Sequence, residues 1–209
     1  GGVEFPEDAH VSPHLFVAHL KLALMERGVQ FLWSNKVTSL VAGSQPAVQL
    51  DHQTLNADAI IVAAGAASGK LAKTAGVNLP LQPGKGMSFS LTENVPQLTR
   101  PLLLKEARLA VTPMVGGVRI GGTMELGEWN LSIDLVRLGG MKTGLSTFLP
   151  KFKSGADSVS EGQVWSGLRP CSPDGMPYLG GTDRAPGIFF ATGHGMMGVS
   201  LAPITGQMM

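Results

Sequence analysis

The sequence contains little charge, few aromatic residues and a single cysteine. Charged residues make up 15% of the 209 residues and the net charge is +1, so the chain lacks the electrostatic footprint of a nucleic-acid-binding protein. Cys171 has no second cysteine for an internal disulfide, and a zinc site built from cysteines is excluded for the same reason. This cysteine usage favours a reducing compartment.

Long apolar runs are also missing. None reaches the roughly 18 residues of a membrane-spanning helix, and the longest, such as Ala59–Ala64, have the length of a strand. We therefore predict no transmembrane segment and a cytoplasmic location, either free or peripheral at the inner face of the membrane. The sequence opens with Gly1–Phe5, without a signal peptide or an initial methionine, which predicts a segment from the middle of a longer chain.

Glycine and apolar residues are abundant instead. Glycine accounts for 28 of the 209 residues and apolar residues for 44%. The apolar fraction excludes intrinsic disorder, and the length suits one domain or slightly more with a sizeable core. The glycines indicate tight turns and places where backbone approaches a neighbour closely.

The pattern of predicted elements changes near Leu81 and changes back near Gly162. A mixed α/β pattern gives way to successive strands joined by turns, and then returns. We therefore predict a mixed α/β (α+β) fold of two parts: residues 11–82 and 160–209 with parallel strands, and residues 1–10 and 83–159 with an antiparallel sheet. The predicted strands are residues 29–33, 36–41, 47–50, 57–64, 87–92, 102–105, 109–113, 118–123, 162–168 and 188–191, and the predicted helices are residues 13–27, 68–75, 134–148 and 197–209.

The segment Gly193–Gly198 matches the pattern G-x-G-x-x-G between a predicted strand and a predicted helix. A dinucleotide-binding unit needs a second strand and an acidic residue about 20 positions further on, but only eleven residues follow Gly198. The alternative is a plain glycine turn into a helix. In both cases glycine lets the backbone approach a ligand, and the helix N-terminus favours an electron-rich group.

Two further segments carry a chemical signal. Residues 62–68 end a buried strand in small side chains, which suits either a flat ligand beyond the strand end or simple packing. Arg169 is held between Leu168 and Pro170 after an apolar strand. A rigidly mounted guanidinium suits bidentate binding of a carboxylate, but it also suits pairing with a structural acid such as Asp174, and the residues alone leave both open.

Together these segments resemble the D-amino-acid oxidase-type FAD-dependent oxidoreductases, a family that includes D-amino-acid dehydrogenases, glycine oxidases and sarcosine oxidases. The resemblance covers nearly the whole chain. It rests on V-A-A-G-A-x-S at residues 62–68, W-x-G-L-R-P-x-x-P-D-G-x-P-x-x-G at residues 165–180 and A-T-G-H-G-x-x-G-x-x-L-A-P-x-T-G at residues 191–206. R-I-G-G-T-M-E at residues 119–125 is similar to the D-amino-acid dehydrogenase branch in particular.

The resemblance implies FAD-dependent oxidative deamination of a D-amino acid, with hydride passing from the α-carbon to flavin N5. It implies that Arg169 binds the substrate carboxylate, and that His194 either acts as a general base or orients backbone and stacks near the ring. It further implies that residues 11–82 and 160–209 belong to a Rossmann-like FAD-binding domain and that residues 1–10 and 83–159 form an antiparallel substrate domain. The residues that the resemblance places at the cofactor are Val37, Ala64, Gly65, Gly193, His194, Gly195, Met196, Met197 and Gly198.

The chain departs from the family in one respect. Family members begin with a strand, G-x-G-x-x-G and a helix that bind the ADP part of FAD, and this chain resembles only the C-terminal portion. We therefore expect a cloned fragment, a split gene product or a degraded protein, with FAD in the full-length protein and little or none in this chain. A homodimer or an N-terminal partner chain would cover the surface left open. The alternatives are a glycine- or sarcosine-oxidase-like amine oxidase and an inactive carboxylate-binding or interaction fragment.

Overall fold

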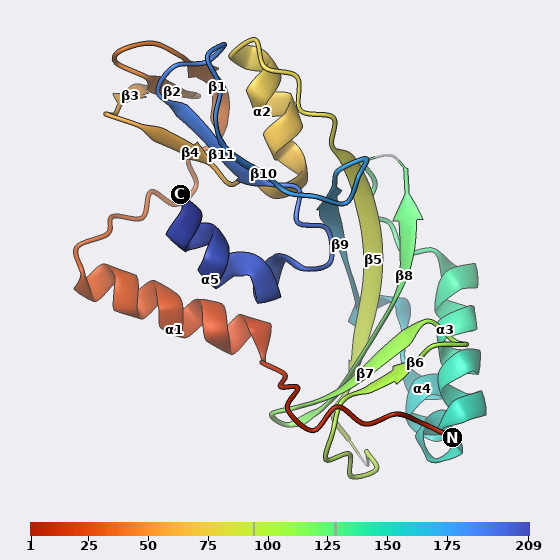
Figure 1. Cartoon of the computed structure of the whole chain (residues 1–209). Helices are drawn as coiled ribbons and strands as arrows, with labels where there is room; N and C mark the ends of the chain where they lie inside the picture. The colour runs from red at the N-terminus through yellow and green to blue at the C-terminus, as the bar shows by residue number, and fades with distance from the viewer. Residues whose placement is uncertain (94, 128) are drawn as a thin grey trace. The chain divides into compact units, whose positions relative to one another are not determined.

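The computed structural model describes residues 1–93, 95–127 and 129–209, and the chain divides into two compact units (Figure 1). Each unit has an apolar core of its own. Residues 11–31 belong to unit 1, whereas residues 32–82 belong to unit 2. The assignment of a cofactor domain and a substrate domain stays a prediction. Unit 1 comprises residues 1–31, 87–123 and 132–166, and unit 2 comprises residues 32–86, 124–131 and 167–209.

Unit 1 contains most of a five-stranded sheet with the strand order β6-β7-β8-β5-β9. The β6–β7 and β7–β8 pairs are antiparallel, as predicted for this part of the chain. Leu109 pairs with Gly122, and Val111 pairs with Ile120. The strands are β5 (Gln82–Leu91), β6 (Leu102–Leu104), β7 (Leu109–Met114), β8 (Gly117–Leu126) and β9 (Val164–Cys171), of which β5, β8 and β9 continue past the unit boundary.

Helix α3 (Leu135–Phe148) begins where the sequence predicts, because Asp134 caps it. The Asp134 carboxylate accepts hydrogen bonds from the Val136 and Arg137 N–H groups at 2.9 and 3.1 Å. Positions three and four apart share one face, so Leu138, Met141 and Leu145 point together into the core on the sheet. A short helix, α4 (Lys153–Ser158), follows on the same side of the sheet (Figure 1).

Helix α1 (Pro13–Glu26) also forms as predicted, but none of its residues is buried. The predicted strand over residues 29–33 is wrong, since these residues, all of them described, form no strand. The Val29 N–H already donates to the Leu24 carbonyl at 3.0 Å to close the helix end. Ser34 then takes a positive φ of 59°, which turns the chain toward β1.

Unit 2 contains two three-stranded sheets. In the first, β1 (Val37–Val41), β2 (Ala47–Leu50) and β3 (Thr54–Asn56) form an antiparallel meander. In the second, β11 (Ile188–Thr192) lies between β10 (Tyr178–Gly181), which is antiparallel to it, and β4 (Ile60–Val62), which is parallel to it. The parallel strand predicted over residues 57–64 is therefore present but shorter.

The side chains of the short strand β4 alternate between the core and the surface. Ile60 and Val62 are buried in the core of unit 2, whereas Ile61 between them is 55% exposed. Helix α2 (Ser68–Thr74) packs on β1, and its Thr74 hydroxyl accepts the Leu40 N–H at 2.9 Å. A 3₁₀ turn, η1 (Gly65–Ala67), joins β4 to α2, so the small residues after β4 lie at the carboxyl end of a parallel strand.

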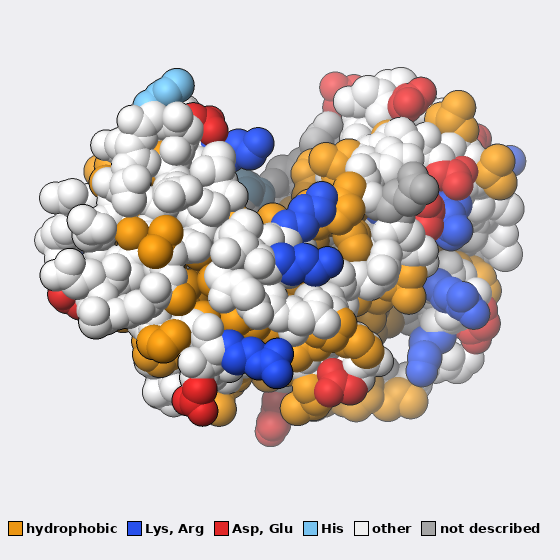
Figure 2. Space-filling view, turned by 90° about the horizontal axis from the view of Figure 1, so that it is seen from above, with side chains coloured by type: hydrophobic (Ala, Val, Ile, Leu, Met, Phe, Trp, Pro, Cys, Tyr) orange, Lys and Arg blue, Asp and Glu red, His pale blue; other side chains and the backbone are white. Residues whose placement is uncertain are grey.

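The last element is helix α5 (Gly198–Met208), which continues through Pro203. Among the described residues, no helix is both long and apolar enough to cross a membrane. Figure 2 shows acidic and basic side chains interspersed with apolar and uncharged ones on the face in view, so charges of both signs share this face.

Candidate functional site

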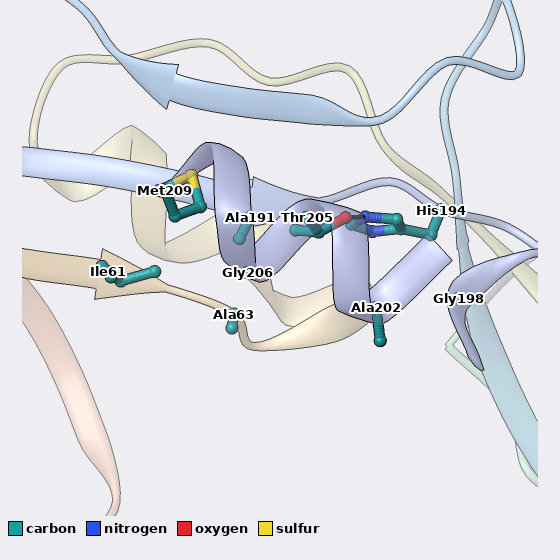
Figure 3. Close-up of a pocket in the computed structure, with 9 residues that line it drawn as sticks. All are labelled: Ile61, Ala63, Ala191, His194, Gly198, Ala202, Thr205, Gly206 and Met209. Carbon is teal, nitrogen blue, oxygen red and sulfur yellow. Dashed lines mark hydrogen bonds between the residues drawn. The ribbon is translucent and has the colours of Figure 1, made fainter. Parts of the chain in front are cut away.

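The strands β4 and β11 and the helix α5 of unit 2 line a cavity of about 450 Å³ (Figure 3). Ala63 follows β4 directly, and Ala191 lies in β11. Both side chains are small, so a flat ligand can come close to the strand ends. The full lining consists of Ile61, Ala63, Ala191, His194, Gly198, Ala202, Thr205, Gly206 and Met209.

Helix α5 presents a stripe of small residues to this cavity. Gly198, Ala202 and Gly206 recur every four residues and therefore share one helix face. Larger side chains at these positions would fill the space that the cavity occupies. The four-residue spacing is visible in the sequence, so this signal could have identified the lining of the cavity before the structure did.

The glycine-rich turn before α5 is held by backbone hydrogen bonds. Gly193 and Gly195 have φ values of +86° and +54°, which favour glycine. The Gly195 N–H donates to the Pro170 carbonyl at 2.9 Å, and the Met197 N–H donates to the His194 carbonyl at 2.9 Å. These two donors are engaged, whereas the first N–H groups of a helix such as α5 have no partner within the helix.

The His194 side chain is held by the C-terminal part of α5. Its Nε2 atom lies 2.9 Å from Thr205 Oγ1 in a hydrogen bond that Figure 3 draws as a dashed line. Thr205 is only 9% exposed, and both residues line the cavity. This contact fixes the orientation of the imidazole, while the role of His194 as a general base stays a prediction.

Arg169 lies near the end of β9, and its guanidinium packs against Gly86 of the neighbouring strand β5. The Nη1 atom is buried and has no hydrogen-bond partner among the described residues. The Asp174 carboxylate instead accepts the Met176 N–H at 3.0 Å, and no ion pair joins Asp174 to Arg169 in the described part of the chain. The described protein therefore leaves the Nη1 donor without an acceptor, which is unusual for a buried polar atom.

A partly buried ion pair involves Lys85, the residue before Gly86 in β5. Lys85 Nζ is 3.5 Å from Glu125 Oε1, and the Lys85 side chain is only 6% exposed. The pair links β5 to β8, which are neighbours in the sheet. This ion pair was not predicted from the sequence, where its one signal is a lysine between two glycines just before the strand predicted over residues 87–92.

The structure brings some of the predicted cofactor residues together and separates others. His194 and Gly198 line the cavity with Ala63 and Ala191. Val37 instead packs on the core of unit 2 at the start of β1. The remaining predicted residues are not part of the lining and lie between β4 and α2 or between β11 and α5: Ala64, Gly65, Gly193, Gly195, Met196 and Met197.

These residues fit a flavin better than a metal ion. Ala63, Ala191, Ala202 and Gly206 leave backbone accessible to a flat ring, and the N-terminus of α5 provides N–H donors. Among the described residues, no group of three or more His, Cys, Asp and Glu side chains is placed to hold a metal ion.

The sequence is similar to curated proteins of known activity. A D-amino acid dehydrogenase from Rhodopseudomonas palustris (strain HaA2) is 31% identical over 206 residues, which are 97% of this chain and 47% of that protein. A D-amino acid dehydrogenase from Rhizobium rhizogenes (strain K84) is 32% identical over 206 residues, which are 97% and 48% of the two chains. The chain therefore spans about half the length of the curated relatives that it matches.

The fold is similar to solved flavoenzyme structures. Glycine oxidase from Geobacillus kaustophilus superposes with a TM-score of 0.81 at 26% identity, over 91% of this chain and 51% of that chain. L-Proline dehydrogenase from P. horikoshii superposes with a TM-score of 0.79 at 17% identity, over 94% and 54% of the two chains, and shares the fold. The DAO family, described as FAD dependent oxidoreductases, matches residues 1–209. The chain belongs to this family of FAD-dependent oxidoreductases.

Proposed function

We propose that the natural protein containing this chain oxidatively deaminates a D-amino acid with FAD. Membership of the FAD-dependent oxidoreductase family supports the cofactor. Two relatives named D-amino acid dehydrogenase, at 31% and 32% identity, support the substrate class. The observation in this chain that carries the proposal is the buried Nη1 atom of Arg169, which lacks an acceptor in the described protein.

Arg169 would bind the carboxylate of the amino acid. A guanidinium offers parallel N–H donors that match the two oxygens of a carboxylate, and a buried donor without a partner gains most from such an acceptor. Leu168 and Pro170 on either side restrict the backbone of the arginine. A fixed guanidinium places the α-carbon of the substrate reproducibly, which is the main requirement when a cofactor performs the redox step.

The cavity of unit 2 would hold the flavin. Ala63, Ala191 and Ala202 would contact it, and the N–H groups in the first turn of α5 would face its electron-rich atoms. Bound FAD supplies a two-electron acceptor for the hydride that leaves the α-carbon. The amine loses a proton as the C=N bond forms, and water then hydrolyses the imino acid to a keto acid and ammonia.

We assign the two parts of the chain to these tasks as the sequence predicts. Residues 11–82 and 160–209, which include the cavity lining, would belong to the FAD-binding domain. Residues 1–10 and 83–159, with the antiparallel strands β6, β7 and β8, would belong to the substrate-binding domain. Two properties stay predictions: peripheral binding at the inner face of the membrane, and association as a homodimer or with a partner chain. Light scattering on the purified natural protein measures its oligomeric state.

Steady-state kinetics of the natural protein with D-amino acids and a dye acceptor test the proposal. Arg169→Ala should lower kcat/KM by about 30-fold or more, because truncating one partner of a buried hydrogen-bonded charge pair costs roughly 2–5 kcal/mol. Arg184→Ala removes an exposed arginine of the same unit and serves as the matched control. An unchanged kcat/KM in Arg169→Ala would refute the assignment.

A glycine- or sarcosine-oxidase-like amine oxidase is the second candidate, favoured by the glycine oxidase structure at a TM-score of 0.81. The same assay decides between the two, since this enzyme would turn over glycine or sarcosine faster than any D-amino acid. An inactive binding fragment would show neither turnover nor the visible absorbance of bound flavin.

A further inference from the structure

Strand β5 carries glycine at two positions that face the same side of the sheet. Successive side chains of a strand alternate between faces, so Gly84 and Gly86 share a face and Lys85 points to the other. A Cβ atom at Gly84 would lie 2.7 Å from Cys171 Sγ, and a Cβ atom at Gly86 would overlap the guanidinium of Arg169. The thiol and the guanidinium of β9 therefore occupy the space that side chains on β5 would take.

The backbone of β5 is poorly able to yield to a larger residue. It lies between β8 and β9 in the sheet, with a strand on each side. The ion pair between Lys85 and Glu125, at 3.5 Å, ties it to β8 from the opposite face. Because the backbone is held in this way, a methyl group at residue 86 would displace the guanidinium rather than the strand.

We propose that Gly86 is a positioning residue for Arg169. Its missing side chain lets the planar guanidinium lie directly on the backbone of β5, and this placement puts Nη1 in a buried position without a protein acceptor. Gly86 thereby determines how close to the backbone of β5 the guanidinium, and a carboxylate bound to it, can lie. The inference rests on the proposed role of Arg169 and adds the residue that determines where its guanidinium sits.

A double-mutant cycle in the natural protein tests the inference. Gly86→Ala should lower kcat/KM with D-amino acids by on the order of 100-fold, since a displacement of about 1 Å in a positioning group can cost that much. In the Arg169→Ala background the same substitution should change kcat/KM by less than about 3-fold, because the displaced group is gone. Gly121→Ala on β8 is the matched control, since its Cβ would meet no atom closer than 4.0 Å.

The outcomes separate this inference from the proposed function. If Arg169→Ala leaves kcat/KM unchanged, the role of Arg169 fails and the inference fails with it. If Arg169→Ala is impaired but Gly86→Ala is not, or if the two effects multiply, Gly86 does not act through Arg169 while the proposed function stands.

A measurement of stability covers the case in which Gly86→Ala does not fold well. The thermal midpoint of Gly86→Ala should then rise when Arg169→Ala is added, because the overlap with the guanidinium is removed. A double variant that melts no higher than Gly86→Ala would overturn the inference.

Discussion

The ion pair between Lys85 and Glu125 predicts unequal effects for the loss of its two partners. The Lys85 side chain is 6% exposed, whereas the Glu125 side chain is 34% exposed. Glu125→Met takes this carboxylate away from an almost fully buried ammonium, and the loss of one partner of a fully buried pair, about 3–5 kcal/mol of the free energy of unfolding, is the upper limit of the expected cost. Lys85→Met inserts an apolar chain of similar length and leaves a carboxylate on a side chain that is 34% exposed, although its Oε2 atom is buried. A smaller loss of about 1–2 kcal/mol is therefore expected.

The double variant Lys85→Met, Glu125→Met completes this prediction. Replacing both partners of a buried pair by apolar residues is often close to neutral, so the double variant should be more stable than Glu125→Met alone. Urea unfolding of the natural protein, followed by circular dichroism, gives the four free energies of unfolding. Lys36→Met removes an exposed lysine of the same unit as a control and should stay within about 0.5 kcal/mol of the wild type.

Two results would refute this reasoning. Lys85→Met could cost as much as Glu125→Met, and the difference in exposure would then not determine the cost. The double variant could also lose the sum of the two single losses, and the two charges would then not be coupled across β5 and β8.

Three further substitutions probe the cavity and the core. Ala202→Leu should fill the cavity and lower the flavin absorbance of the purified natural protein, whereas Val199→Leu, at an exposed position outside the lining, should not; equal flavin content would contradict this. Leu145→Ala empties a fully buried site in α3 and should cost about 2–5 kcal/mol in urea unfolding, while Phe148→Ala, which is 43% exposed, should cost less, and the reverse order would be inconsistent with the core. Thr205→Val removes the hydroxyl bonded to the imidazole of the turn and should cost about 1–3 kcal/mol, which a wild-type unfolding curve would disprove.

The elements that the sequence predicted well are those with local signals. Asp134 caps α3, and the apolar residues that follow at spacings of three and four define its buried face. The hairpin of β1 and β2 follows from two short apolar runs around Gly43 and Pro46. Such signals lie within a few residues of the element itself, so no knowledge of the tertiary structure is needed to use them.

The failures arise where a neighbouring element decides the local structure. Residues 29–33 have the apolar and aromatic composition of a strand, but the end of α1 uses the Val29 N–H and Ser34 turns the chain. The apolar residues of α1 fall mostly on one broad face, yet none of the residues in this helix is buried. The composition of a segment indicates which secondary structures it can form, whereas the hydrogen bonds available at its ends determine which one it forms.

The candidate site was predicted in its residue types more than in its contacts. Arg169 stood out in the sequence because of its rigid setting, but its alternative partner Asp174 could be set aside only when the structure showed that carboxylate bound to the Met176 N–H. The glycine turn was also evident, but the N–H of Gly195 was not available for a ligand, because Pro170 accepts it. Each of these contacts joins segments whose pairing no local pattern encodes.

The small residues of β5 and α5 show where further information lay. A spacing of two on a strand and of four on a helix each mark one face, so Gly84 with Gly86, and Gly198 with Ala202, can be grouped once the type of element is known. This grouping does not show what fills the space beside the small residues. On β5 the space is taken by side chains of β9, and on α5 it remains a cavity. Small residues thus lie against a charged side chain in one place and beside an open cavity in the other, and the neighbouring elements determine which of the two occurs.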